Sequence, residues 1–109
     1  MKTLKFASEL VPLILSGSKT STWRLFDDKD LQVGDTLKFQ ISGSLENFAN
    51  AEISHITEKP LGMLTEEDED GHEAFPSKEV MYETYTRYYN RDVSQQTPVK
   101  IIRFKLLDS

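Results

Sequence analysis

Three side chains that can take part in polar chemistry lie close together near the N-terminus, in the segment GSKTSTWR, residues 17–24. Gly17 is expected to end a helix, which places Lys19 in the turn that follows. Thr22 and Arg24 are two residues apart on a predicted strand, so their side chains project from the same face. An amine, a hydroxyl and a guanidinium therefore converge, as anion binding or proton transfer requires. The alternative is a solvent-exposed Lys and Arg beside an ordinary strand.

The residue types that the chain lacks exclude several kinds of metal site and catalytic nucleophile. It contains no cysteine, which excludes a disulfide framework, a thiolate zinc site, an iron–sulfur cluster and a cysteine nucleophile. His55 and His72 are the only histidines, too few for a structural zinc site. Residues 66–71 begin like a calcium loop, but Ser77 occupies the twelfth position, where a bidentate Glu is required. We therefore expect neither a metal nor a cofactor.

Length and composition indicate one domain covering residues 1–109. With 38% hydrophobic residues, a chain of 109 residues can form one core without disulfides. No apolar run approaches the roughly 20 residues of a membrane span, and the N-terminus has no signal-peptide pattern. We therefore expect a cytoplasmic protein with no membrane partner, either a monomer or a weak dimer.

The charge of the chain is unevenly distributed. The net charge is -5, yet six of the eighteen acidic residues lie between Glu66 and Glu73, where there is no Lys or Arg. The rest of the chain has twelve acidic and thirteen basic residues. Tight nonspecific binding to a long nucleic acid is therefore disfavoured, because it depends on many cationic contacts to phosphate. A small substrate in a local basic pocket remains compatible with this charge.

The order of predicted elements favours an α+β domain with a small mixed or barrel-like sheet. Thr65 and Asp68 form a capping-box pattern, and Ser77 can cap the longest helix. The predicted elements are a strand containing Leu4 and Phe6, a helix over 8–16, strands over 20–24, 36–42 and 49–57, a helix from 77 to about 89, and a strand over 99–107.

Two aromatic features have more than one interpretation. Trp23 lies on the strand face opposite Thr22 and Arg24, where it can belong to the core or stack on a base. The group Tyr82, Tyr85, Tyr88 and Tyr89, with Arg87 and Arg91 between and after them, has the spacing of a helix that packs on a sheet. The same group could stack on RNA.

The chain resembles a known family over nearly its whole length. The pattern Gly17-x-Lys19-x-x-Thr22-x-Arg24, then Val33-Gly34-Asp35, then Glu73 ahead of a helix, is similar to that of the ASCH domain. The resemblance implies a small PUA-like mixed β-barrel of about five to six strands with two to three helices. It also implies a function related to RNA or nucleosides, with the site beside residues 19–24.

One subgroup of this family comprises small amidohydrolases that release acetate from N4-acetylcytidine with a Lys, Thr and Glu triad. The resemblance implies that Lys19, Thr22 and Glu73 are catalytic, with Glu69 or Asp70 as alternatives for the acid. It implies that substrate is bound by three further residues, Arg24, Gly17 and Trp23.

Amide hydrolysis at such a site needs a nucleophile and a proton carrier. Without cysteine, the nucleophile would be Thr22 or a water, and Lys19 would be the base. Glu73 would orient Lys19 or return a proton to the leaving amine. Two other functions for the same cleft are a noncatalytic RNA-binding module and a ribonuclease.

Overall fold

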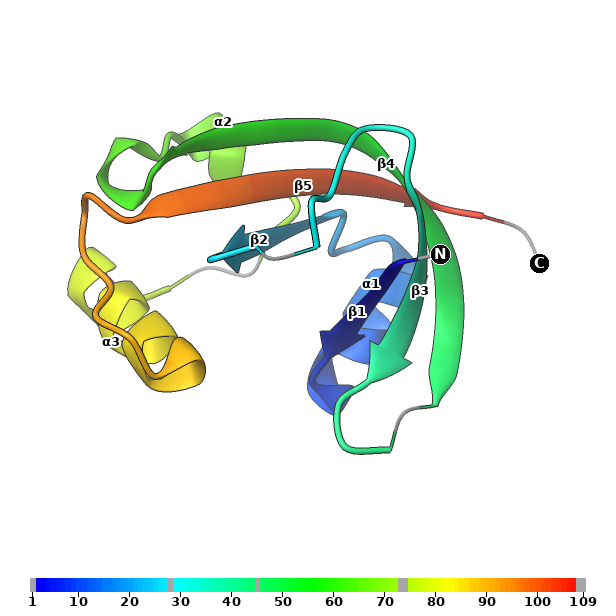
Figure 1. Cartoon of the computed structure of the whole chain (residues 1–109). Helices are drawn as coiled ribbons and strands as arrows, with labels where there is room; N and C mark the ends of the chain where they lie inside the picture. The colour runs from blue at the N-terminus through cyan, green and yellow to red at the C-terminus, as the bar shows by residue number, and fades with distance from the viewer. Residues whose placement is uncertain (1, 28, 45, 73–74, 108–109) are drawn as a thin grey trace.

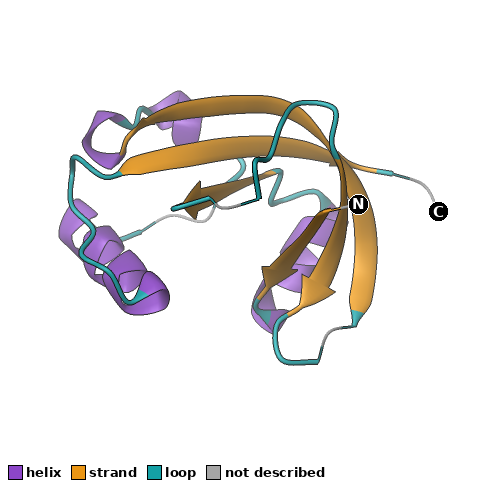
Figure 2. Cartoon of the chain, in the orientation of Figure 1, coloured by secondary structure: helices purple, strands orange, loops and turns teal. Residues whose placement is uncertain are grey.

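The structure is a computed structural model of the chain, and it describes residues 2–27, 29–44, 46–72 and 75–107. These residues form a sheet of five strands, three α-helices and two 3-10 turns, in the arrangement shown in Figures 1 and 2. In chain order the elements are β1 (Lys2–Phe6), η1 (Ser8–Leu10), α1 (Val11–Ser16), β2 (Ser21–Leu25), β3 (Thr36–Ile41), β4 (Asn47–Pro60), η2 (Leu61–Met63), α2 (Glu66–Glu69), α3 (Lys78–Tyr89) and β5 (Pro98–Leu106).

The sheet is mixed, with the strand order β1-β3-β4-β5-β2. The β1–β3 pair is parallel and the other three pairs are antiparallel. Two register shifts, one between β3 and β4 and one between β4 and β5, each leave one residue of β4 unpaired, and such β-bulges bend a strand. Figure 1 shows the long strands β4 and β5 crossing the molecule together while the sheet curls into a half-barrel. The α+β fold class and the PUA-like architecture are thus confirmed.

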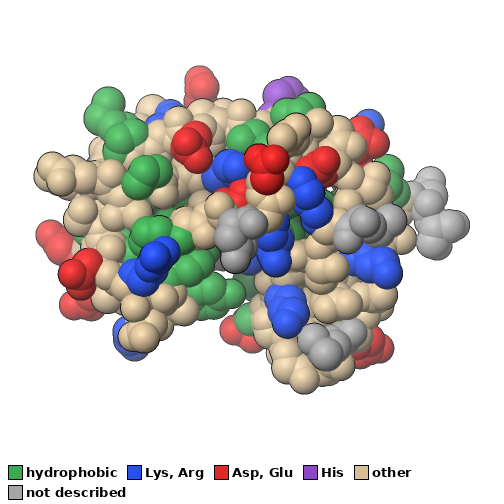
Figure 3. All heavy atoms as spheres, viewed as in Figure 1, with side chains coloured by type: hydrophobic (Ala, Val, Ile, Leu, Met, Phe, Trp, Pro, Cys, Tyr) green, Lys and Arg blue, Asp and Glu red, His purple; other side chains and the backbone are tan. Residues whose placement is uncertain are grey.

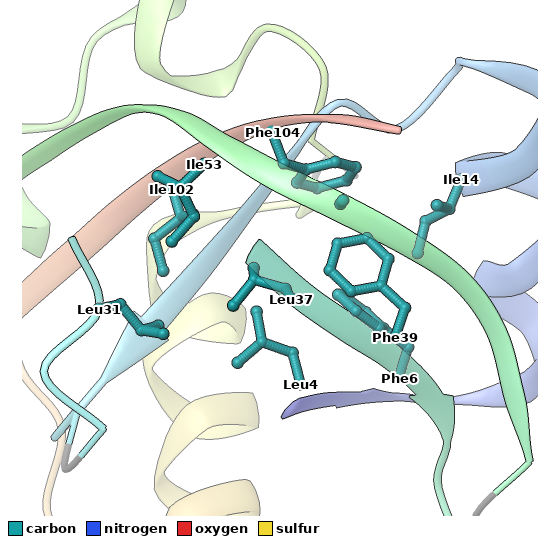
Figure 4. Packing of buried hydrophobic residues seen from close by; sticks show 10 residues of the cluster. Leu4, Phe6, Ile14, Leu31, Leu37, Phe39, Ile53, Ile102 and Phe104 are labelled. Atoms are coloured by element: carbon teal, nitrogen blue, oxygen red, sulfur yellow. The ribbon is translucent and has the colours of Figure 1, made fainter. Parts of the chain in front are cut away.

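Two hydrophobic clusters stabilise the curled sheet, and β5 contributes to both. Ile102 and Phe104 of β5 belong to the first cluster, which includes Phe39 of β3 packed edge-on against Phe104 (Figure 4). Val99 and Ile101 of β5 belong to the second cluster, beneath α3. Because alternate side chains leave a strand on opposite faces, one apolar strand can serve two cores. This explains how β5 has buried apolar side chains on both of its faces.

The predicted helix caps are confirmed, whereas the predicted helix over 8–16 is divided into the 3-10 turn η1 and the α-helix α1. Gly17 ends α1 with a left-handed backbone at φ 87°. Thr65 and Asp68 form the capping box of α2, and the Ser77 hydroxyl accepts the Val80 amide at the start of α3. β4 runs to Pro60, three residues beyond the predicted strand over 49–57, because it pairs with β5 along this length.

The loop after β2 is fixed by one carboxylate. Asp27 accepts a hydrogen bond from Lys100 Nζ at 2.8 Å and from the amides of Lys29 and Leu31 at 2.9 and 3.1 Å. Partial burial opposes ionisation of Asp27, but these hydrogen bonds prevail and hold its pKa below its ordinary value. Leu31 is thereby held in the first core, where it is 2% exposed.

This network predicts a dependence of stability on pH. The Asp27 pKa is lower in the folded than in the unfolded chain, so on acidification the unfolded chain takes up the proton first. We expect the free energy of unfolding to fall as the pH drops below about 5, and Asp27→Asn or Lys100→Met to flatten the slope. Urea unfolding at several pH values measures the slope of the free energy of unfolding against pH. An unchanged slope in both variants would contradict the role of this pair.

Candidate functional site

A cavity of about 310 Å³ lies between the turn into β2, the β1–η1 segment and α3, and we call it the site cavity. Figure 1 shows α3 and the β1–α1 unit below opposite sides of β2, and Figure 3 shows hydrophobic side chains beside the hollow between these two lobes. Lys19, Thr22, Trp23 and Arg24 all line this cavity. Lys19, Thr22 and Arg24, which the sequence predicts to converge, therefore line one cavity, and Trp23 lines it as well.

The most unusual property of the site is the burial of its polar side chains. Among the described residues, the buried polar or charged side chains are Lys19, Ser21 and Thr22, which are 3%, 0% and 5% exposed. Lysine is rarely buried to this extent unless its amine has partners. Lys19 Nζ donates to the carbonyl oxygen of Ser21 at 2.8 Å. The alternative of a solvent-exposed lysine is therefore wrong.

The end of α1 places Lys19 at the cavity. After Gly17 reverses the chain, the Lys19 amide donates to the carbonyl oxygen of Leu13 at 3.0 Å. This bond ties the turn to α1 and delivers the chain to β2. Gly17 itself is not among the residues lining the cavity, so its position supports a structural role in the turn.

Arg24 connects the two open edges of the curled sheet. Its Nη2 donates to the carbonyl oxygen of Lys5 on β1 at 3.1 Å, and its Cζ lies 5.0 Å from the ring centroid of Phe6. Its buried Nε has no hydrogen-bond partner within the described ranges. The guanidinium is thus held beside the cavity while retaining an unused donor.

Aromatic side chains form another wall of the site cavity. Trp23 is 4% exposed and belongs to the second core, which confirms its core interpretation, yet it also lines the cavity. The His72 ring stacks on Trp23 with a centroid distance of 3.9 Å and an interplanar angle of 9°. Phe75 and Tyr85 continue this wall, with their ring centroids 5.6 Å apart. A flat, unsaturated ligand is suited to such a surface.

Tyr89 separates the site cavity from a neighbouring one and lines both. Burial raises the pKa of its phenol, although the Leu25 amide, which donates to its oxygen at 3.2 Å, acts in the opposite direction. The phenol is therefore neutral at physiological pH and serves as a hydrogen-bonding wall rather than an anion.

The acidic segment between β4 and α3 is tied to the sheet by cations. Arg103 of β5 donates to the carbonyl oxygens of Glu67 and Asp70 at 2.6 and 3.1 Å. Lys59 of β4 pairs with Asp68 at 2.7 Å. Glu69 and Asp70 are exposed and do not line the site cavity, whereas His72 does. Glu73 lies outside the described residues.

No sequence pattern indicates the β1 side of the site cavity. Lys5 and Phe6 of β1 and Glu9 of η1 line it, yet none has a motif that marks a site. They reach β2 only through the curl of the whole sheet, in which β1 and β2 are the outer strands. In the part of the chain that the structure describes, His, Asp and Glu side chains form no metal-binding group of three, and no helix could span a membrane.

Comparison with solved structures identifies the fold. A protein from Enterococcus faecalis V583 matches 99% of this chain and 77% of its own, with a TM-score of 0.78 and 14% identity. The ASCH domain from Lactobacillus crispatus matches 96% of this chain and 79% of its own, with a TM-score of 0.71 and 14% identity. The ASCH protein from Zymomonas mobilis matches 94% of this chain and 65% of its own, with a TM-score of 0.67 and 12% identity.

The chain therefore has the fold of the ASCH domain, as its sequence pattern predicts. No protein-family model and no curated protein sequence matches it.

The contact between Gly71 and Thr20 provides a test of how the site is built. A Cβ at Gly71 would lie 2.0 Å from Thr20 Oγ1, and the Gly71 backbone has φ 78°. Gly43→Ala is a matched control, because Gly43 has φ 90° but open space around it. We expect Gly43→Ala to cost about 1 kcal/mol and Gly71→Ala about 2 kcal/mol more. Urea unfolding measures both, and equal losses would contradict close packing at Gly71.

Proposed function

We propose that this protein hydrolyses the acyl amide on the exocyclic amine of a cytidine-type nucleoside, converting N4-acetylcytidine and water to cytidine and acetate. The observation that carries the proposal is the burial of Lys19 and Thr22 at the wall of an aromatic cavity. A volume of about 310 Å³ lies at the lower end of the range for small-molecule sites.

In this proposal, different walls of the site cavity bind different parts of the substrate. The acylated base lies against the aromatic wall formed by Trp23, His72 and Phe75, whose flat rings complement it. Arg24 anchors a polar group of the substrate through donors that β1 does not use. The ribose then lies toward Arg24 and Tyr89, which also line the site cavity.

Lys19 is the base of the proposed reaction. Removal of an amine from water favours its neutral form, which is the form able to accept a proton. Neutral Lys19 takes a proton from the nucleophile, whose oxygen then attacks the acyl carbon. The carbon–nitrogen bond breaks, and the proton passes to the departing exocyclic nitrogen. Glu73 is proposed to orient Lys19 or to carry this proton.

The nucleophile is the Thr22 hydroxyl or a water. Attack by Thr22 gives an acyl ester on its oxygen, which a water then hydrolyses to acetate and regenerated threonine. Attack by water gives acetate in one step, and Thr22 then donates a hydrogen bond to the developing oxyanion.

RNA binding is the second candidate function. Lys5, Arg24 and the exposed Tyr88 line the site cavity, and such a combination could hold a phosphate and stack on a base. The net charge of -5 favours a small substrate over a long polyanion. Ribonuclease activity in the same cleft would appear as cleavage of RNA that has no acyl group.

Replacement of Lys19 tests the base. We expect Lys19→Met to lower cytidine release from N4-acetylcytidine by about 100-fold or more, because methionine fills the buried space but accepts no proton. Chromatography at neutral pH measures the product. Lys38→Met, at an exposed position on β3, should retain full activity. Turnover by Lys19→Met at the wild-type rate would eliminate Lys19 as the base, and an inactive wild type that binds RNA would favour the second function.

Replacement of Thr22 distinguishes the two nucleophiles. We expect Thr22→Val, which keeps the shape but loses the hydroxyl, to lose about 100-fold or more in kcat if threonine attacks, and about 10-fold if water attacks. Thr22→Ser keeps a hydroxyl and should retain most activity in either case. Acetate release by the valine variant at the wild-type rate would exclude any role for this hydroxyl. Far-ultraviolet circular dichroism confirms that each variant is folded.

A further inference from the structure

A second cavity of about 400 Å³ lies on the other side of Arg24 and Tyr89, and these two residues line both cavities. We call it the basic cavity. Its border combines three cationic side chains with one acidic one. The cations are Arg24, Lys29 and Arg91, and the acid is Asp27.

The single acidic side chain of the basic cavity is already engaged. Asp27 pairs with Lys100 at 2.8 Å and accepts two backbone amides. Its charge is therefore compensated by a lysine that is not part of the cavity border. Lys29 and Arg91 are exposed, and Arg24 has a buried Nε without a hydrogen-bond partner within the described ranges. The cavity thus concentrates positive charge in a chain whose net charge is -5.

The backbone at Phe26 supports a binding role for this cavity. Phe26 has φ 53°, in the left-handed region, which costs a residue with a Cβ about 1–2 kcal/mol. This conformation leaves the ring 39% exposed, with Arg91 Cζ 4.4 Å from its centroid and Tyr89 packed edge-on at 5.5 Å. The ring therefore holds Arg91 at the cavity. Such local strain concentrates at functional sites.

We propose that the basic cavity binds a phosphate ester on the ribose of the substrate, so that the preferred ligand is a cytidine nucleotide rather than the nucleoside. This inference rests on the proposed function for the identity of the base. The base occupies the site cavity, and the ribose passes the partition formed by Arg24 and Tyr89. The phosphate then meets guanidinium and ammonium donors, which form charge-assisted hydrogen bonds with it. The ligand is a free nucleotide, because the chain as a whole is acidic.

Binding of cytidine and of cytidine 5′- and 3′-monophosphates, measured by isothermal titration calorimetry at low salt, tests the inference. We expect one monophosphate to bind the wild type about 10-fold or more tightly than cytidine, as one charge-assisted contact supplies. Arg91→Gln and Lys29→Gln should each reduce this preference several-fold. Arg87→Gln, an exposed arginine on α3 outside both cavities, should preserve it.

Equal affinity of the wild type for cytidine and both monophosphates would overturn the inference, as would a preference that survives both substitutions. A short RNA with an internal cytidine that binds about 10-fold more tightly than either monophosphate would also overturn it, in favour of an RNA site. These measurements need no turnover. A protein that prefers the monophosphate but leaves N4-acetylcytidine intact would therefore disprove the proposed reaction and keep the phosphate site.

Discussion

The carbonyl oxygen of Gly71 accepts hydrogen bonds from the amides of Thr20 and Ser21 at 2.8 and 3.2 Å, and the rest of the site depends on this contact. Through it, the segment between β4 and α3 is joined to the turn that carries Lys19. On the other side of the turn, the Thr20 carbonyl oxygen accepts the Phe104 amide at 3.2 Å. The start of β2 is thus held between β5 and the segment that joins β4 to α3. A glycine is required because any side chain would enter the space of Thr20.

The parts of the molecule that the sequence predicts are those encoded by local rules. Gly17 marks the end of a helix, Thr65 and Ser77 mark the starts of two others, and alternation identifies the strands. The same rules place Thr22 and Arg24 on one side of β2, and the cavity lies there. These signals depend only on residues close together in the sequence, so they can be recognised without knowledge of the tertiary structure.

The parts that the sequence does not predict depend on long-range geometry. Lys5 and Phe6 face Arg24 because β1 pairs in parallel with β3 and the sheet curls, which no local pattern encodes. The burial of Lys19 also results from the tertiary structure, so no local pattern predicts it, because a lysine in a turn is ordinarily exposed to solvent. From the sequence, core packing and a place in the site are alternatives for Trp23, but in the structure the residue packs in the second core and also lines the site cavity.

The pairing of β2 has a consequence for how the protein folds. Ser21 of β2 lies opposite Arg103 of β5, and Leu25 lies opposite Val99, so β2 pairs with a strand that comes much later in the sequence. Contacts between residues far apart in the sequence form late and slowly. The entropy cost of closing the long loop between them arises before the contacts stabilise the chain. During synthesis, the strand bearing Thr22 and Arg24 has no edge to join until β5 has left the ribosome. The site cavity can therefore form only after β5 has been made, whereas β1 and β3 can pair before it.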